Sequence, residues 1–63
     1  MNLQRTKAAD DILSQANDQI GFSERDYESV LDEADTCAAM QHHDSVEFDD
    51  MLWALANVFG WTN

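Results

Sequence analysis

Apolar residues recur at spacings of three and four along three stretches of the chain, which is the period of helices that bury one face. These stretches cover about residues 3–20, 24–42 and 46–59. The chain has no proline, and its two glycines, Gly21 and Gly60, stand where the first and third stretches should end. Because only short turns separate the stretches, the pattern predicts an all-α fold, a small three-helix bundle, with residues 1–63 as a single domain.

The middle stretch has the clearest start signal. Ser23 is a favourable N-cap, and Asp26 three residues later completes a capping box with Asp in place of Glu. Phe22, before the cap, can pack on Tyr27 as a hydrophobic staple. These three signals agree on one boundary, and we expect this helix to end near residues 41–43.

The ends of the other helices follow from weaker signals. We expect the first helix to begin at residue 2 or 3. We expect the third to begin after residue 44 or 45, where Asp44 and Glu47 would form an acidic capping box. Beyond the last helix, Trp61 can fold back on the final turn.

The charge of the chain is strongly one-sided. Thirteen acidic residues face three basic ones in 63 residues, a formal charge of −10. This charge argues against direct binding to DNA, RNA or anionic membranes, whose phosphates would repel it, and favours partners with positive surfaces. The competing interpretation is a small acidic domain whose charges serve only solubility.

The cellular compartment of the protein is indicated by the lack of a cysteine pair, a membrane span and a secretory signal in the sequence. One cysteine, Cys37, excludes a disulfide within the chain and fits a reducing environment. No apolar run reaches the roughly 18 residues of a membrane span. The first residues also lack the apolar core of a secretory signal. We therefore expect a complete, soluble, cytoplasmic chain that makes no contact with membranes.

Carboxylates recur at same-face helical spacing on all three predicted helices. On the middle helix, like charges at i, i+4 oppose helix formation by a few tenths of a kcal/mol per pair, which suggests a role other than stability. Such carboxylates lie about 5–6 Å apart at Cβ, the same order as successive phosphates of a nucleic-acid strand. Arginine pairs with both groups through similar forked hydrogen bonds. The candidate partner-binding carboxylates are Glu24, Glu28, Asp32, Asp35, Asp11, Asp18, Glu47, Asp49 and Asp50.

Trp53 is the candidate apolar contact. It lies off the apolar stripe of the third helix and shares a flank with Asp49. Because tryptophan is enriched at interface hot spots, Trp53 is a candidate for a partner contact or a homodimer contact. The alternative is a tryptophan at the edge of a core that is too small to enclose it.

Other residue patterns indicate no chemical site. Residues 44–52 resemble the exit half of an EF-hand, but the preceding loop lacks the oxygen ligands and the glycine that calcium needs. His42 and His43 are adjacent and point in different directions, and the cap signals separate His43 from Glu47. Cys37 lies on the apolar stripe, near carboxylates that raise the pKa of a thiol. No nucleophile, base and orienting group can be assembled, so we expect no metal, no cofactor and no enzymatic activity.

The acidic helix SERDYESVLDEAD, in a very short chain with few bases, resembles the small acidic proteins that phages encode against bacterial defences. These include the anti-CRISPR proteins, several of which mimic DNA. The resemblance lies in the size and charge of the whole chain, and no residue position is carried over from the family. It implies binding to a Cas protein or a crRNA-guided complex where DNA would otherwise sit, in the cytoplasm of a bacterial host cell.

The sequence therefore predicts a non-enzymatic inhibitor that acts as a monomer or a homodimer. It would occupy a positively charged nucleic-acid-binding surface of a target protein by DNA mimicry. The alternative is a small protein–protein regulatory module, such as an antitoxin or a transcription-factor antagonist. That module would bind its partner through the apolar flank around Trp53.

Overall fold

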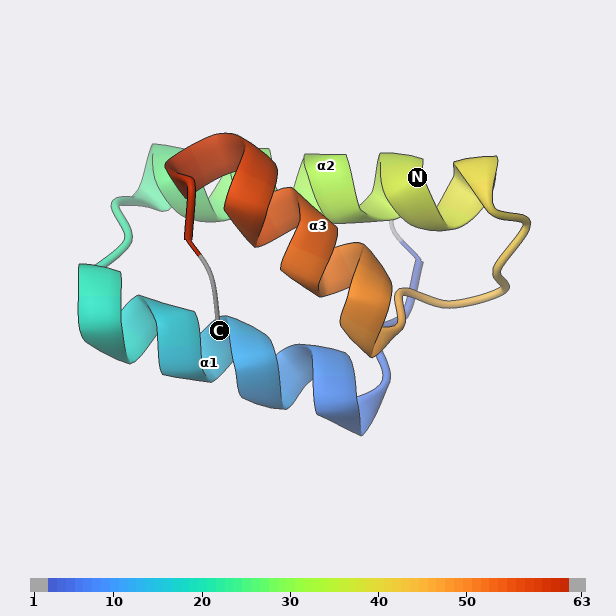
Figure 1. Cartoon of the computed structure of the whole chain (residues 1–63), viewed down its shortest axis with the longest axis horizontal. Helices are drawn as coiled ribbons and strands as arrows, with labels where there is room; N and C mark the ends of the chain where they lie inside the picture. The colour runs from blue at the N-terminus through green and yellow to red at the C-terminus, as the bar shows by residue number, and fades with distance from the viewer. Residues whose placement is uncertain (1–2, 62–63) are drawn as a thin grey trace.

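The computed structural model describes residues 3–61, which form three α-helices. The helices are α1 (Lys7–Ile20), α2 (Glu24–Met40) and α3 (Phe48–Phe59). α1 and α2 run in opposite directions, and α3 packs against both of them (Figure 1). The predicted small all-α bundle is therefore confirmed. None of the helices in this part of the chain is both long and apolar enough to cross a bilayer.

The core is built around α3, which contributes the large, fully buried side chains of Met51 and Leu55. α1 and α2 present several alanines to the interior, and these small side chains let the helices pack closely. The buried apolar residues are Ala9, Ile12, Leu13 and Ala16 from α1, Val30, Ala34, Cys37 and Ala38 from α2, Met51, Ala54 and Leu55 from α3, and Val46 and Trp61 outside the helices. The predicted apolar stripes therefore meet in one core.

α2 begins where the sequence predicts. The hydroxyl of Ser23 accepts a hydrogen bond from the N–H of Asp26 at 3.1 Å, and the Asp26 carboxylate accepts one from the N–H of Ser23 at 3.3 Å. The ring of Phe22 lies 6.4 Å from that of Tyr27 and stacks on Phe59 at 4.8 Å. The staple therefore joins the α1–α2 turn to the end of α3 as well as to α2.

The predicted start of the first helix, at residue 2 or 3, is wrong. Residue 2 lies outside the described residues, and residue 3 belongs to an extended segment. α1 begins at Lys7, with Thr6 as an N-cap whose side chain accepts an N–H of the first turn at 3.2 Å. The N–H of Thr6 donates to the carbonyl of Val46 at 2.9 Å, and the N–H of Val46 donates to the carbonyl of Gln4 at 2.8 Å. The backbone before Lys7 is therefore paired with a distant segment instead of continuing the helix.

The predicted start of the third helix is also wrong, because α3 begins at Phe48 rather than directly after residue 44 or 45. Val46 is buried and held in the bridge to the N-terminal segment, so it cannot join the helix. Glu47 becomes the N-cap, and its N–H donates to the carboxylate of Asp50 at 3.0 Å. An acidic cap therefore forms three residues further along than predicted.

The end of α3 is tied to α1. Gly60 ends the helix in the left-handed conformation, with φ 68°, and its N–H donates to the carbonyl of Ala56 at 2.8 Å. Trp61 folds back as predicted, with its N–H 3.4 Å from the carbonyl of Leu55. Its buried indole N–H donates to the Gln19 side chain at 3.0 Å. Trp61 thus links the residue after the end of α3 to the last turn of α1.

The N-cap of α1 gives a test of where this helix begins. Thr6→Ala should lower the free energy of unfolding by about 1 kcal/mol, because it removes the cap. If Thr6 lay inside a longer helix, the same change should raise stability by roughly 0.5 kcal/mol, since alanine has the higher helix propensity. Urea unfolding followed by circular dichroism measures the sign.

Thr36→Ala is the matched control for this test. Thr36 is exposed inside α2, and its hydroxyl donates to the carbonyl of Asp32 at 2.9 Å. Its replacement should leave stability unchanged or raise it by a few tenths of a kcal/mol. Equal losses for both threonines would contradict the assignment of Thr6 as the cap.

Candidate partner-binding surface

The outer face of α2 carries three carboxylates, which we call the α2 stripe: Glu24, Glu28 and Asp32. They follow one another at a spacing of one helical turn, and all three are exposed. None of them forms an ion pair with any residue between 3 and 61. Like charges at this spacing oppose the helix slightly, and the capping box and the buried opposite face of α2 offset that cost.

Asp35 was predicted to continue this stripe, and it lies on α2 one turn further on. It is only half-exposed, and its carboxylate accepts a hydrogen bond from the N–H of Leu3 at 3.3 Å. Asp35 therefore helps to hold the extended N-terminal segment, and the part of the stripe that is free for a partner ends at Asp32.

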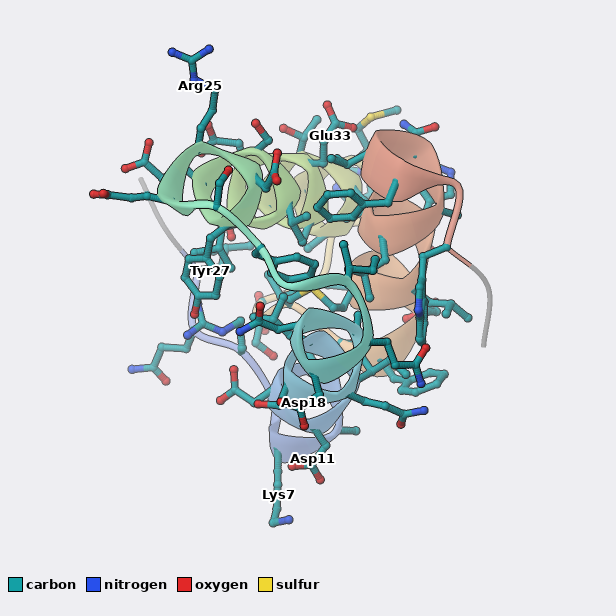
Figure 2. The ribbon with its side chains drawn as sticks, turned by 90° about the vertical axis from the view of Figure 1, so that its left-hand side faces the viewer. Lys7, Asp11, Asp18, Arg25, Tyr27 and Glu33 are labelled. Atoms are coloured by element: carbon teal, nitrogen blue, oxygen red, sulfur yellow. The ribbon has the colours of Figure 1, made fainter. Side chains whose placement is uncertain are left out.

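The candidate carboxylates of α1 lie apart from the α2 stripe. Asp11 and Asp18 are exposed (Figure 2), and Asp11 pairs with Lys7 at 3.2 Å. Arg5 forms a hydrogen-bonded ion pair with Asp10, which raises the pKa of the Arg5 guanidinium. These two bases therefore neutralise carboxylates at the start of α1.

The third base, Arg25, is exposed and points away from the body of the protein (Figure 2). No lysine or arginine follows it, whereas nine of the thirteen acidic residues do. The surface formed by α3 and by α2 beyond its first turn is therefore negative without compensation from Lys or Arg of its own.

Of the three candidate carboxylates at the start of α3, Glu47 and Asp49 are exposed and Asp50 is not. Asp50 is fully buried, so the prediction that it contributes to an outer acidic stripe is wrong. Its spacing from Glu47 suggested a shared outer face. In the first turn of a helix, however, a carboxylate at this position can turn back to the N-cap, and Asp50 does so.

Asp50 is also bonded to His43, which comes from the turn between α2 and α3. The Nδ1 atom of His43 lies 2.7 Å from Oδ2 of Asp50 and 3.6 Å from the carboxylate of Glu47. His42, with φ 61°, reverses the chain after α2. The helix is broken between His43 and Glu47 as predicted, but the turn brings the two side chains together in a way that spacing alone did not indicate.

The pKa values of this pair shift in opposite directions. The hydrogen bond that His43 donates to Asp50 raises the pKa of His43, and Glu47 and Asp49 add to the effect. Burial would raise the pKa of Asp50, but the bonds from His43 and from the N–H of Glu47 outweigh burial and lower it. Between these two pKa values the pair is an imidazolium bound to a carboxylate.

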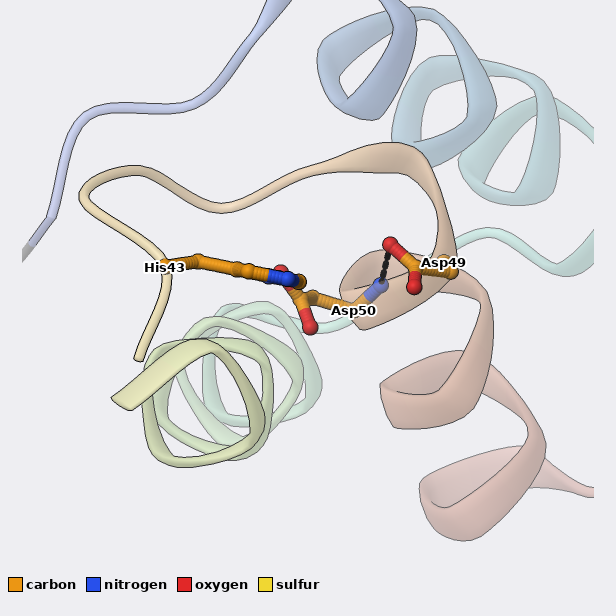
Figure 3. A group of neighbouring side chains, drawn as sticks. All are labelled: His43, Asp49 and Asp50. Atoms are coloured by element: carbon orange, nitrogen blue, oxygen red, sulfur yellow. Dashed lines mark hydrogen bonds and ion pairs between the residues drawn. The ribbon is translucent and has the colours of Figure 1, made fainter. Parts of the chain in front are cut away.

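His43, Asp49 and Asp50 each offer a possible metal ligand, and these atoms lie within 4.8 Å of one another. Figure 3 shows their present roles: Asp49 accepts the N–H of Asp50 at 3.1 Å, while His43 lies against the Asp50 carboxylate. A cation would have to displace His43 from an enclosed carboxylate. These contacts stabilise the start of α3, and the absence of a metal site remains a prediction.

Trp53 is 46% exposed, off the buried face of α3 as its position in the sequence predicted. Met40, at the end of α2, is 73% exposed. With Cys37 and Gln41 they line an open pocket of about 140 Å³, which we call the Trp53 pocket. Sequence reasoning missed Met40 and Gln41, because only the packing of α2 against α3 places them beside the tryptophan.

Cys37 forms the inner wall of the Trp53 pocket. It is buried, as predicted for a small core residue, and the Gln41 amide lies 3.4 Å from its sulfur. Burial, followed by the neighbouring Asp50, raises the pKa of the thiol. The wall of the pocket is therefore a protonated, weakly polar thiol rather than a nucleophilic thiolate.

Comparison with protein families, curated proteins and solved structures finds no match to this chain. Among the described residues, the α2 stripe and the Trp53 pocket are features from which a function can be inferred.

The His43–Asp50 pair predicts how stability depends on pH. Since the folded pKa of His43 is raised above its unfolded value of about 6.5, its contribution is complete below that pH and is lost as the pH rises through the raised pKa. The contribution of Asp50 is present above its ordinary value of 3.8 and is lost as the pH falls through the lowered pKa. The free energy of unfolding should therefore be highest in mildly acidic solution and should decrease on the alkaline side.

Urea unfolding from about pH 5 to pH 9 measures this profile. His43→Gln should lower stability and flatten the alkaline decrease, because it leaves Asp50 without a cation. His42→Asn is the matched control, since Asn tolerates the left-handed backbone of this exposed neighbour. An NMR titration of the wild type tests the same point without a mutation, and a His43 pKa at or below about 6.5 would contradict the pairing.

Proposed function

We propose that this protein is a non-enzymatic inhibitor that occupies a positively charged, nucleic-acid-binding surface of a target protein by charge mimicry. The observation that supports this proposal is the α2 stripe, whose carboxylates are exposed, evenly spaced and unpaired within the described residues. Because no lysine or arginine follows Arg25, a basic partner meets no opposing Lys or Arg charge across α3 and most of α2.

The geometry of the stripe suits a cleft that holds a phosphate backbone. Carboxylates one helical turn apart lie about 5–6 Å apart at Cβ, on the order of the phosphate spacing along a strand. Arginine binds carboxylate and phosphate through similar forked hydrogen bonds. Val30, Ala34 and Ala38 anchor the opposite face of α2 in the core, so the stripe is presented by a rigid helix.

The net charge adds long-range attraction to this local match. A formal charge of −10 on 63 residues accelerates encounter with a basic surface and makes the affinity depend steeply on salt. Glu47, Asp49, Asp11 and Asp18 are exposed on the other helices and contribute to this field. Asp11 contributes least, because it is paired with Lys7.

Within this class, we propose an anti-CRISPR role in the cytoplasm of a bacterial host cell. The target would be a Cas protein or a crRNA-guided complex at the place where DNA binds, and the inhibitor would act as a monomer or a homodimer. The size and charge of the chain and its single helical domain support this assignment.

Removal of the stripe charges tests the proposal. Tagged wild-type protein captures partners from a bacterial lysate, and the captured partners are eluted with increasing salt. Each partner is then bound to labelled DNA. The pure protein is added to measure how well it displaces the partner from the DNA. The triple variant Glu24→Gln, Glu28→Gln, Asp32→Asn should lose at least about tenfold in displacement affinity, the effect of roughly 1.4 kcal/mol. Displacement by the wild type should weaken steeply as salt rises.

A variant with the same change in net charge controls for non-specific attraction. Asp11→Asn, Asp18→Asn and Asp44→Asn together remove three exposed carboxylates outside the stripe. This control should lose much less affinity than the stripe variant. Equal losses of affinity in the stripe variant and the control variant would show that only net charge matters. If the stripe variant displaced the partner from DNA as well as the wild type does, charge mimicry by α2 would be refuted.

A regulatory module that binds a protein partner through an apolar surface is the second candidate. The Trp53 pocket favours it, since Met40 and Trp53 leave apolar surface exposed side by side. In that case Trp53→Ala should weaken partner capture by about tenfold or more, whereas the stripe variant should have little effect. Salt-resistant capture of a partner that binds no nucleic acid would favour this candidate over charge mimicry.

A further inference from the structure

The Trp53 pocket has two exposed apolar walls, one from each helix. Met40 comes from α2 and Trp53 from α3, and they are 73% and 46% exposed. The pocket volume of about 140 Å³ suits one leucine-sized or phenyl-sized group, since cavities of about 150 Å³ take up benzene. Burial of such a group against these walls would remove apolar surface of both helices from water.

The inner wall of the pocket carries no charge. Cys37 is buried with a raised thiol pKa, and the Gln41 amide is directed to its sulfur at 3.4 Å. Among residues 3–61, the other lining residues are Met40 and Trp53. The group that enters should therefore be apolar, with no cation of its own at the tip.

One carboxylate on α2, that of Glu33, lies one helical turn from the pocket. Glu33 lies one turn before Cys37 on α2, and Asn57 lies one turn after Trp53 on α3. The two meet across the helices, because the amide of Asn57 donates to the carboxylate of Glu33 at 3.2 Å. This bond uses one oxygen of Glu33. Because Glu33 and Asn57 each lie one turn from a lining residue, we infer that this carboxylate is beside the pocket.

A second carboxylate, that of Asp49, lies one helical turn from the pocket on α3. Asp49 is exposed, one turn before Trp53 on α3, and it is near enough to raise the pKa of Cys37. No lysine or arginine occurs in residues 26–63, so both carboxylates stand in a part of the sequence without such bases. The apolar pocket therefore has an acidic rim on both helices.

We propose that the Trp53 pocket docks a basic, amphipathic helical segment of a protein partner. One apolar side chain enters the pocket, and a Lys or Arg one turn to either side reaches Glu33 or Asp49. The aliphatic stems of these bases cover Met40 and Trp53 while their charged ends remain at the rim. This inference rests on the proposed function, because it supplies an apolar anchor for the same basic partner that the α2 stripe attracts.

The charge of the chain argues for this occupant over a second copy of the protein. A dimer formed through the pocket would bring together two acidic rims, each on a chain with a formal charge of −10. Like charges that face each other across an interface oppose association. A basic segment meets the same rim with opposite charge.

A pair of designed peptides tests the inference. The first is a helical peptide of about 18 residues, five turns, with Leu on one face and Lys on the other. The second has the same number of Lys but Ala in place of Leu. The protein is labelled with ¹⁵N, and the indole N–H signals of its two tryptophans are followed during titration. Trp61 is the internal reference, because its side chain is buried against the core and its indole N–H donates to Gln19 of α1.

The Leu/Lys peptide should shift the Trp53 indole and leave Trp61 unchanged, and it should bind about tenfold or more tightly than the Ala/Lys peptide. Met40→Gln and Trp53→Ala should each weaken binding by about tenfold. Ile20→Gln is the matched control, since Ile20 is a 40% exposed apolar residue at the end of α1. Glu33→Gln, which keeps an acceptor for Asn57, should weaken binding and reduce its dependence on salt.

Several results would overturn the inference. These are equal affinities for the two peptides, no binding of the Leu/Lys peptide, or binding that Met40→Gln does not change. A dimer that sedimentation detects and that Met40→Gln dissociates would assign the pocket to a second copy. If stripe substitutions abolish displacement of DNA while the pocket substitutions have no effect, charge mimicry stands and the docking pocket fails. The reverse result refutes the α2 stripe and keeps the pocket.

Discussion

The arrangement of α2 and α3 depends on one buried carboxylate. Asp50 is fully enclosed, and an ionised carboxylate is tolerated in such a place only when it is paired and hydrogen-bonded. His43 and the N–H of Glu47 provide these partners. The same bonds cap the start of α3 and hold the turn after α2 against its first residues. They therefore join the ends of the two helices whose residues Met40 and Trp53 line the pocket.

The cations that form ion pairs within residues 3–61 lie away from the α2 stripe. Arg5 and Lys7 pair with carboxylates of α1, and His43 pairs with the buried Asp50. A domain of about this size has a thin margin of stability, so repulsion between uncompensated surface charges lowers its free energy of unfolding noticeably. The absence of ion pairs on the α2 stripe within residues 3–61 therefore supports the proposal of a basic partner.

The elements that sequence reasoning predicted correctly are those that local bonds determine. The start of α2 depends on Ser23, Asp26 and a staple within five residues, and all are visible in the sequence. The starts of α1 and α3 depend instead on the pairing of Val46 with residues 4–6, which are distant in sequence. Helical periodicity contains no information about such a bridge, so both helices were predicted too long at their first turn.

The candidate binding residues also fall into those that the helical pattern predicts and those that it does not. Exposure of Glu24, Glu28, Asp32 and Trp53 agrees with the helical pattern, because it depends mainly on which face of one helix is buried. The burial of Asp50 could not be recognised, since a carboxylate at the third position of a helix can turn outward or back to the cap. The inward orientation of the Asp50 carboxylate depends on its bond with His43, which lies seven residues earlier, across a turn.

Charge alone gives attraction without discrimination, because any basic protein would be drawn to a surface of this kind. Discrimination requires a feature that most basic surfaces cannot satisfy, and an apolar pocket with carboxylates on both helices is such a feature. Both surfaces use α2, the stripe on its first half and the pocket on its last turn. A partner that engages both would be captured quickly through charge and retained through the apolar anchor, which acts mainly on the rate of dissociation.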